Sequence, residues 1–125
     1  MTMYRKKIGE VGEQEAIKYL VRNRYKILIR NFRCRFGEID IIARDGEYIV
    51  FIEVKTRKDC RFGVPSEAVS YHKRHKIIKV AQYYLLQKRL EDINVRFDIV
   101  EVIGSLVGDK PVIESVGVIK DAFQL

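Results

Sequence analysis

The chain has 125 residues and a formal net charge of +7, from 24 Lys and Arg against 17 Asp and Glu. Its 47% hydrophobic content excludes a disordered chain and predicts a single domain over residues 1–125. No apolar run approaches the roughly 18 residues of a transmembrane helix, and the basic first segment lacks the apolar stretch of a secretory signal. We therefore expect a cytoplasmic protein without a membrane partner, and the basic excess favours nucleic acid as the partner.

Apolar periodicity and turn residues predict two helices and five strands. In chain order, we expect a helix over residues 9–23, strands over 25–30, 38–44 and 48–57, a helix over 67–90, and strands over 96–103 and 112–119. Ser66 is the expected N-cap of the second helix. Arg96 and Asp98 share a strand face, where an internal ion pair is expected. The order α-β-β-β-α-β with a C-terminal strand predicts an α/β fold, in which helices pack on one mixed sheet.

The strands over 38–44 and 48–57 are expected to form a hairpin, because Asp45-Gly46 between alternating apolar runs is a strong hairpin signal. A two-residue loop would pair Arg44 with Glu47. The pairing then places Asp40 opposite Phe51 and Glu38 opposite Glu53. Because side chains alternate along a strand, one face is expected to carry Glu38, Asp40, Glu53 and Lys55.

Like charges on one strand face destabilise a sheet, and burial adds a desolvation penalty. A hard divalent cation such as Mg²⁺, which prefers oxygen ligands, would relieve both effects. Glu13 points to the same chemistry, because it lies within the apolar stripe of the first helix that should face the sheet. Glu10 lies at the edge of that stripe and is a weaker candidate.

Structural interpretations of the same acids remain open at this point. Glu53 and Lys55 could be solvent-facing residues of an exposed strand. Glu38 could pair with Arg35 or Arg57. Glu13 could be an acid favoured in the first turn by the helix dipole.

Basic residues cluster after the strand that carries Glu53 and on the second helix. They would contact phosphates and position a nucleic acid without reading its sequence, although a solvated face or a snorkelling lysine explains some of them equally well. The candidates for nucleic-acid contact are Arg57, Lys58, Arg61, Lys73 and Lys76. His72, Lys76 and Lys79 fall on one exposed helical stripe.

Five ordered blocks carry a family resemblance. They are GEVGEQEAIKYL, NFRCRFGEIDIIARDG, VFIEVKTR, FGVPSEAV with the following Lys73, and RFDIVEV. Together they closely resemble the YraN-like family of small bacterial predicted endonucleases, which is similar in fold to archaeal Holliday-junction resolvases. Asp40 followed by Glu53-x-Lys55 resembles the PD-(D/E)xK signature of restriction-endonuclease-like nucleases. Ile39 stands where the general signature has Pro, but GEID is this family's own form.

The resemblance implies a restriction-endonuclease-like mixed sheet and a metal site. Asp40 and Glu53, with the backbone carbonyl of Val54, would hold Mg²⁺ or Mn²⁺, and Glu13 would complete the acidic cluster. Lys55 would position and help to deprotonate the attacking water, or would stabilise charge in the transition state.

The expected function is that of a metal-dependent endodeoxyribonuclease that hydrolyses DNA phosphodiester bonds, with branched or junction DNA as one substrate class. One alternative is a nucleic-acid-binding module whose nuclease site is unused or depends on a partner, and another is a scaffold protein with ordinary surface charges. DNA is the expected partner, RNA is not excluded, and the oligomeric state stays open, with a dimer among the options.

Overall fold

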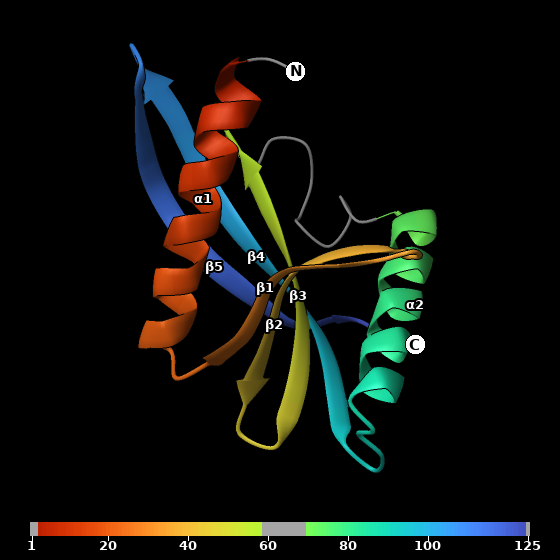
Figure 1. The fold of residues 1–125 in the computed structure, drawn as a ribbon. Coiled ribbons are helices and arrows are strands. Elements are labelled where there is room, and N and C mark those ends of the chain that lie inside the picture. Colours follow the sequence, from red (N-terminus) through yellow and green to blue (C-terminus); the bar gives the residue numbers. More distant parts are fainter. Residues whose placement is uncertain (1–2, 59–69, 125) are drawn as a thin grey trace.

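The computed structural model describes residues 3–58 and 70–124 (Figure 1). Its elements are α1 (Met3–Arg22), β1 (Lys26–Cys34), β2 (Gly37–Asp45), β3 (Tyr48–Arg57), α2 (Tyr71–Gln87), β4 (Asn94–Val107) and β5 (Lys110–Phe123). The predicted order of helices and strands is confirmed. No helix within the described residues is long and apolar enough to cross a membrane.

The five strands form one mixed sheet in the order β1-β2-β3-β4-β5. β3 and β4 run parallel, and the other neighbours are antiparallel. A parallel pair needs a crossover connection, and α2 lies within that connection between β3 and β4. This mixed α/β architecture is consistent with the predicted restriction-endonuclease-like fold.

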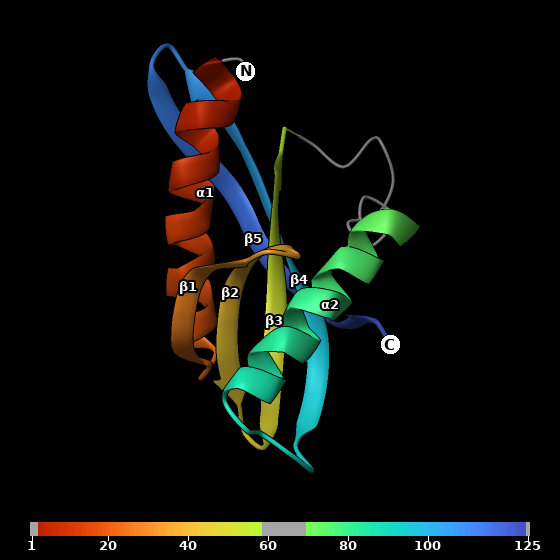
Figure 2. The same ribbon diagram turned by 45° about the vertical axis from the view of Figure 1, so that its right-hand side comes forward.

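The two helices cover opposite faces of the sheet, as Figure 2 shows with α1 on the left and α2 on the right. On the α1 face, Ala16 and Leu20 pack with residues such as Ile52 and Val100. On the α2 face, the apolar stripe of the helix packs on aromatic and branched residues that include Phe51 and Phe97, which stack on each other. β3 and β4 are therefore buried on both sides along much of their length, which explains their near-continuous apolar sequences.

The hairpin between β2 and β3 differs from the prediction by two positions in register. Asp45 pairs with Tyr48, so the loop consists of Gly46 and Glu47 instead of Asp45-Gly46. Gly46 takes the positive φ of 59° that the turn requires. Asp45 stays in the strand, where its carboxylate accepts a hydrogen bond of 2.7 Å from Arg96. A shift of two residues keeps every side chain on its predicted face but changes which residues lie opposite each other.

The predicted start of the second helix is wrong. α2 begins at Tyr71, and its N-cap is Ser70, whose side-chain oxygen accepts from the backbone N–H of Lys73 at 3.2 Å. Ser66, the predicted N-cap, lies outside the described residues. The sequence therefore predicted correctly that a serine caps this helix, but it predicted the wrong serine.

Candidate active site

β2 and β3 separate where the candidate acids lie. Their ladder runs from Asp45 and Tyr48 to Ile41 and Ile52, and beyond it β2 continues to pair with β1. Figure 1 shows this end of the β1–β2 hairpin turning away from β3 toward α2. We call this place, defined by Asp40 on β2 and Glu53 on β3, the strand fork.

Asp40 is the first residue of β2 beyond the ladder. Its Oδ2 accepts a hydrogen bond of 2.8 Å from the backbone N–H of Val54. The carboxylate therefore satisfies a strand N–H at the point where the ladder with β2 has ended. This bond fixes Asp40 beside the strand that carries Glu53, Val54 and Lys55.

Glu53 is the first residue of β3 beyond the same ladder, and 12% of its side-chain surface is exposed. Its Oε1 lies 2.6 Å from Nζ of Lys73, which comes from the first turn of α2. Ser70 caps this helix through the N–H of Lys73, so the cap and the ion pair hold the same residue. The helix on one face of the sheet thus supplies the cation for Glu53.

Glu13 belongs to α1, which covers the other face of the sheet. Its Oε1 is buried and has no hydrogen-bond partner among the described residues. The preceding Gly12 permits a close approach of helix to strand, because a Cβ there would lie 2.4 Å from Oγ1 of Thr56 on β3. An orphaned carboxylate oxygen carries a desolvation cost of roughly 1–3 kcal/mol or more, which a ligand at the strand fork would remove.

The three acids interact electrostatically at the strand fork. Burial and, next, the charge of Glu53 raise the pKa of Asp40 from 3.8 to about 7, and Glu13 adds to the increase. The N–H of Val54 and the charge of Lys73 act in the opposite direction. A carboxyl group with a pKa near neutrality among other acids is typical of functional sites.

The donor set fits a hard divalent cation only in part. Within the described residues, no three side chains of His, Cys, Asp or Glu are gathered closely enough to hold a metal ion. Mg²⁺, however, is usually held by one or two carboxylates and keeps several water ligands, so it does not need a cage of three acids. The buried, unpaired oxygen of Glu13 and the raised pKa of Asp40 are both features that a cation would relieve.

Lys55 follows Glu53 by two residues on β3, and therefore lies on the same face of the sheet. Its side chain is half-buried. Among the described residues, no carboxylate forms an ion pair with its ammonium group, in contrast to Lys73. Lys55 is thus a cation close to Glu53 along β3 that pairs with no acid among the described residues.

The other predicted basic residues are placed differently. Arg57 is 15% exposed and its Nε donates to Glu101 at 2.7 Å, so a contact with phosphate would require this pair to open. Lys58, the residue after the end of β3, and Lys76 on α2 are exposed. Arg61 lies outside the described residues. The role of these residues in binding nucleic acid stays a prediction.

The predicted position of Glu38 opposite Glu53 is wrong. Glu38 lies beyond the end of the β2–β3 ladder, on the part of β2 that pairs with β1. Its carboxylate forms an ion pair of 2.9 Å with Arg33 on β1, and both side chains are exposed. Glu10, the weaker candidate, is exposed on α1.

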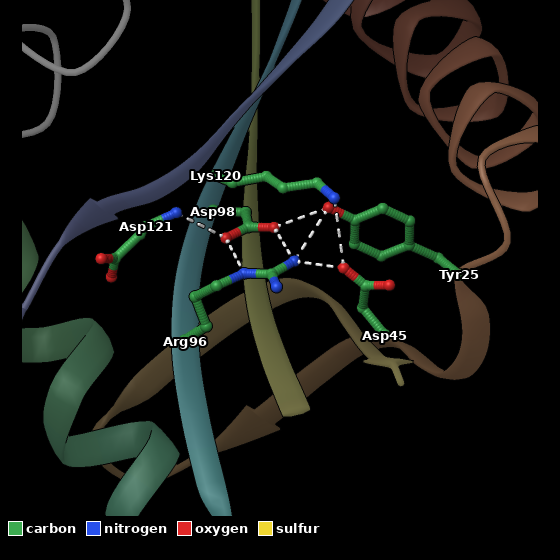
Figure 3. A network of polar contacts seen from close by, with 6 residues as sticks. All are labelled: Tyr25, Asp45, Arg96, Asp98, Lys120 and Asp121. Carbon is green, nitrogen blue, oxygen red and sulfur yellow. Dashed lines mark hydrogen bonds and ion pairs between the residues drawn. The ribbon is translucent and has the colours of Figure 1, made fainter. Parts of the chain in front are cut away.

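A second polar cluster lies near the start of β4 (Figure 3). Arg96 binds both carboxylate oxygens of Asp98 at 2.8 Å, which confirms the predicted pair. Asp98 is fully buried, and it also accepts from the hydroxyl of Tyr25 at 2.8 Å and from the N–H of Asp121 at 2.9 Å. Burial and the bond to Asp98 raise the pKa of Tyr25, so the phenol stays protonated as a donor.

Sequence reasoning missed two contacts that matter here, the pairing of Lys73 with Glu53 and the close approach at Gly12. Both join segments that lie far apart in the sequence. A glycine inside an otherwise amphipathic helix was the available signal for the second contact, because such a residue often marks a close approach.

Comparison with known proteins places the chain in a family. The protein-family model described as "Uncharacterised protein family UPF0102" matches residues 12–102 of the chain. A UPF0102 protein of Clostridium kluyveri is 50% identical over 125 residues, and one of Clostridium tetani is 49% identical over 125 residues, with all of both chains covered in each case. A UPF0102 protein of Geobacter metallireducens is 48% identical over all of this chain and 98% of its own length. The chain belongs to the UPF0102 family.

Proposed function

We propose that the protein is a metal-dependent endonuclease of the PD-(D/E)xK class that hydrolyses phosphodiester bonds in DNA. The observation that carries the proposal is the strand fork, where Asp40 and Glu53 are the first residues of two strands past their shared ladder. Burial, the charge of Glu53 and that of Glu13 from the opposite face all raise the pKa of Asp40, which supports the proposal. The resemblance to the PD-(D/E)xK signature supports the same assignment.

Each residue has a chemical task in this proposal. Asp40, Glu53 and the carbonyl of Val54 would hold Mg²⁺ or Mn²⁺, and Glu13 would complete the site directly or through water. The bound ion would supply a nucleophilic water at neutral pH and would neutralise charge on the phosphate. Lys55 would place a fixed positive charge where negative charge develops as the P–O bond to the leaving oxygen breaks. Lys73 holds the carboxylate of Glu53 in place.

A second candidate function is a nucleic-acid-binding module whose nuclease site is unused or depends on a partner. One observation favours it: Asp40 and Glu53 each have one partner without a metal, the N–H of Val54 and the ammonium group of Lys73. This function requires binding that weakens with salt, since phosphate contacts release counterions, but it requires no turnover.

The test is a cleavage assay on end-labelled DNA with Mg²⁺ or Mn²⁺, and with EDTA as the control. The substrates are single-stranded DNA, linear duplex, a flap and a four-way junction. We expect strand cutting of at least one substrate that stops when the divalent ion is chelated. Binding without cutting on all substrates would contradict the nuclease proposal and would favour the binding module.

Replacing Asp40 with Asn is expected to change the pH dependence of stability. The folded protein holds a proton on Asp40 up to a pKa of about 7, while the unfolded chain releases it near 3.8. The stabilisation from this proton is therefore complete below pH 4 and is lost as the pH rises through 7. Without divalent ions, Asp40→Asn should be more stable than wild type by up to about 4 kcal/mol at pH 8, and this advantage should shrink to less than half toward pH 5.

Urea unfolding at pH 5 and pH 8 in EDTA measures this difference. Asp109→Asn is the matched control, because Asp109 lies in the exposed turn between β4 and β5. A constant difference between Asp40→Asn and wild type at both pH values would contradict the assigned pKa shift.

A further inference from the structure

The turn between β1 and β2 carries an aromatic ring onto α2. Phe36 is 36% exposed, and its ring lies edge-on to Tyr83 with centroids 6.1 Å apart. The guanidinium of Arg35 lies 4.8 Å from the centroid of the same ring. Gly37 follows with a φ of 141°, and a Cβ at this position would lie 3.5 Å from the side chain of Val80. The ring is therefore held by a hairpin that rests on a helix.

The surface of α2 beside this turn is basic. His72, Lys76 and Lys79 are exposed, and with Tyr83 they follow the spacing i, i+4, i+7 and i+11 of one helical stripe. The 17 residues of α2 include no acid. The stripe therefore carries no negative charge of its own helix that would repel a phosphate backbone.

The basic stripe connects the aromatic ring to the strand fork. Tyr83 contacts Phe36 at one end of the stripe, and Lys73, near its other end, pairs with Glu53. Along the chain, Phe36 precedes Asp40 by four residues, which limits their separation to about 14 Å. The tip of the β1–β2 hairpin lies against α2 in both Figure 1 and Figure 2. A strand held at the fork would therefore reach Phe36 within a few nucleotides.

We propose that the exposed part of the Phe36 ring, next to the guanidinium of Arg35, is a stacking platform for an unpaired base of a single-stranded DNA segment, whose phosphates contact Lys76 and Lys79. A positive groove with aromatic rings is the usual means of binding single strands, because every base has a face that can stack. A base inside a continuous duplex is already stacked on both sides and has no face to offer. The inference rests on the proposed function and deepens it, since the substrate becomes DNA with an unpaired strand.

Binding in EDTA tests the platform without any turnover. Fluorescence anisotropy is measured with labelled oligodeoxythymidylate, a duplex of the same length and oligouridylate. Phe36→Leu keeps an apolar side chain on Tyr83 but removes the aromatic face, and Phe36→Tyr retains it. The matched control is Tyr48→Leu, because Tyr48 is 40% exposed with Arg96 over its ring at 5.1 Å, at the start of β3.

We expect Phe36→Leu to weaken single-stranded DNA binding about tenfold or more, with duplex binding unchanged. Phe36→Tyr and Tyr48→Leu should bind as wild type does. An unchanged affinity in Phe36→Leu, or an equal loss for single strand and duplex, would overturn the platform. Tighter binding of oligouridylate than of oligodeoxythymidylate would overturn the proposal that the bound single strand is DNA.

The cleavage assay separates this inference from the nuclease proposal. Phe36-dependent binding without cutting of any DNA would support the platform and would reject the nuclease. Cutting that does not distinguish flap from duplex, and that Phe36→Leu leaves unchanged, would support the nuclease and would reject the platform. Far-UV circular dichroism of each variant verifies that it is folded.

Discussion

Lys55→Ala is expected to slow DNA cutting by about 10²–10³-fold, with little change in the affinity for DNA. The reason is that Lys55 lies on the same face of β3 as Glu53 and, unlike Lys73, pairs with no acid of the described chain. A fixed charge that meets the phosphate mainly in the transition state affects turnover more than ground-state binding.

The measurement is single-turnover cleavage at saturating protein, with binding measured separately in EDTA. Lys26→Ala is the matched control, because it removes the same charge from the exposed start of β1. Glu53→Gln should slow cutting as well, and any residual cutting should require a higher concentration of divalent ion. Cutting by Lys55→Ala at the rate of the Lys26→Ala control would remove Lys55 from the catalytic site.

Asp98→Ala is expected to destabilise the fold by about 3–5 kcal/mol. Asp98 is fully buried and binds Arg96 through both oxygens, while Arg96 is 12% exposed (Figure 3). Removing the acid leaves a nearly buried guanidinium whose remaining acid partner in this cluster is Asp45. The hydroxyl of Tyr25 and the N–H of Asp121 also lose their acceptor.

Urea unfolding gives the free-energy change, and two variants sharpen the result. Asp45→Asn should cost about 1 kcal/mol or less, because that side chain is 22% exposed and its pair is partly solvated. The double variant Arg96→Met with Asp98→Leu should be more stable than Asp98→Ala, since no unpaired charge stays buried. A loss in the double variant equal to that of Asp98→Ala would show that packing, not charge, controls this cluster.

Predictions from the sequence were correct where the periodicity of a single strand or helix determines which way a side chain points. Strand alternation placed Glu53 and Lys55 on one face, and helical spacing placed Glu13 on the side of α1 that faces the sheet. The even slip of the β2–β3 register did not disturb these assignments, because side chains repeat with a period of two. The same slip did change which residues lie opposite each other, so the pairing of Glu38 with Glu53 failed.

What local pattern could not supply are the contacts between distant segments. Asp45 remains in β2 because Arg96, 51 residues later, binds its carboxylate. The cation beside Glu53 is Lys73, and only the placement of α2 brings the two together. Turn signals and helical wheels describe only residues that are close in the sequence. They therefore cannot predict either contact, since both contacts depend on how the elements pack.

The parallel pairing of β3 with β4 has a consequence for how the molecule folds. In this ladder Tyr48 meets Asn94, so partners are 46 residues apart, whereas the hairpins β1–β2, β2–β3 and β4–β5 join sequence neighbours. Closing the longer loop costs more chain entropy before any contact rewards it. We expect the three hairpins to form first. The pairing of β3 with β4, which α2 covers, should form last. Lys73 would then meet Glu53 only in this late step, so a partly folded chain would lack the ion pair that holds Glu53 at the strand fork.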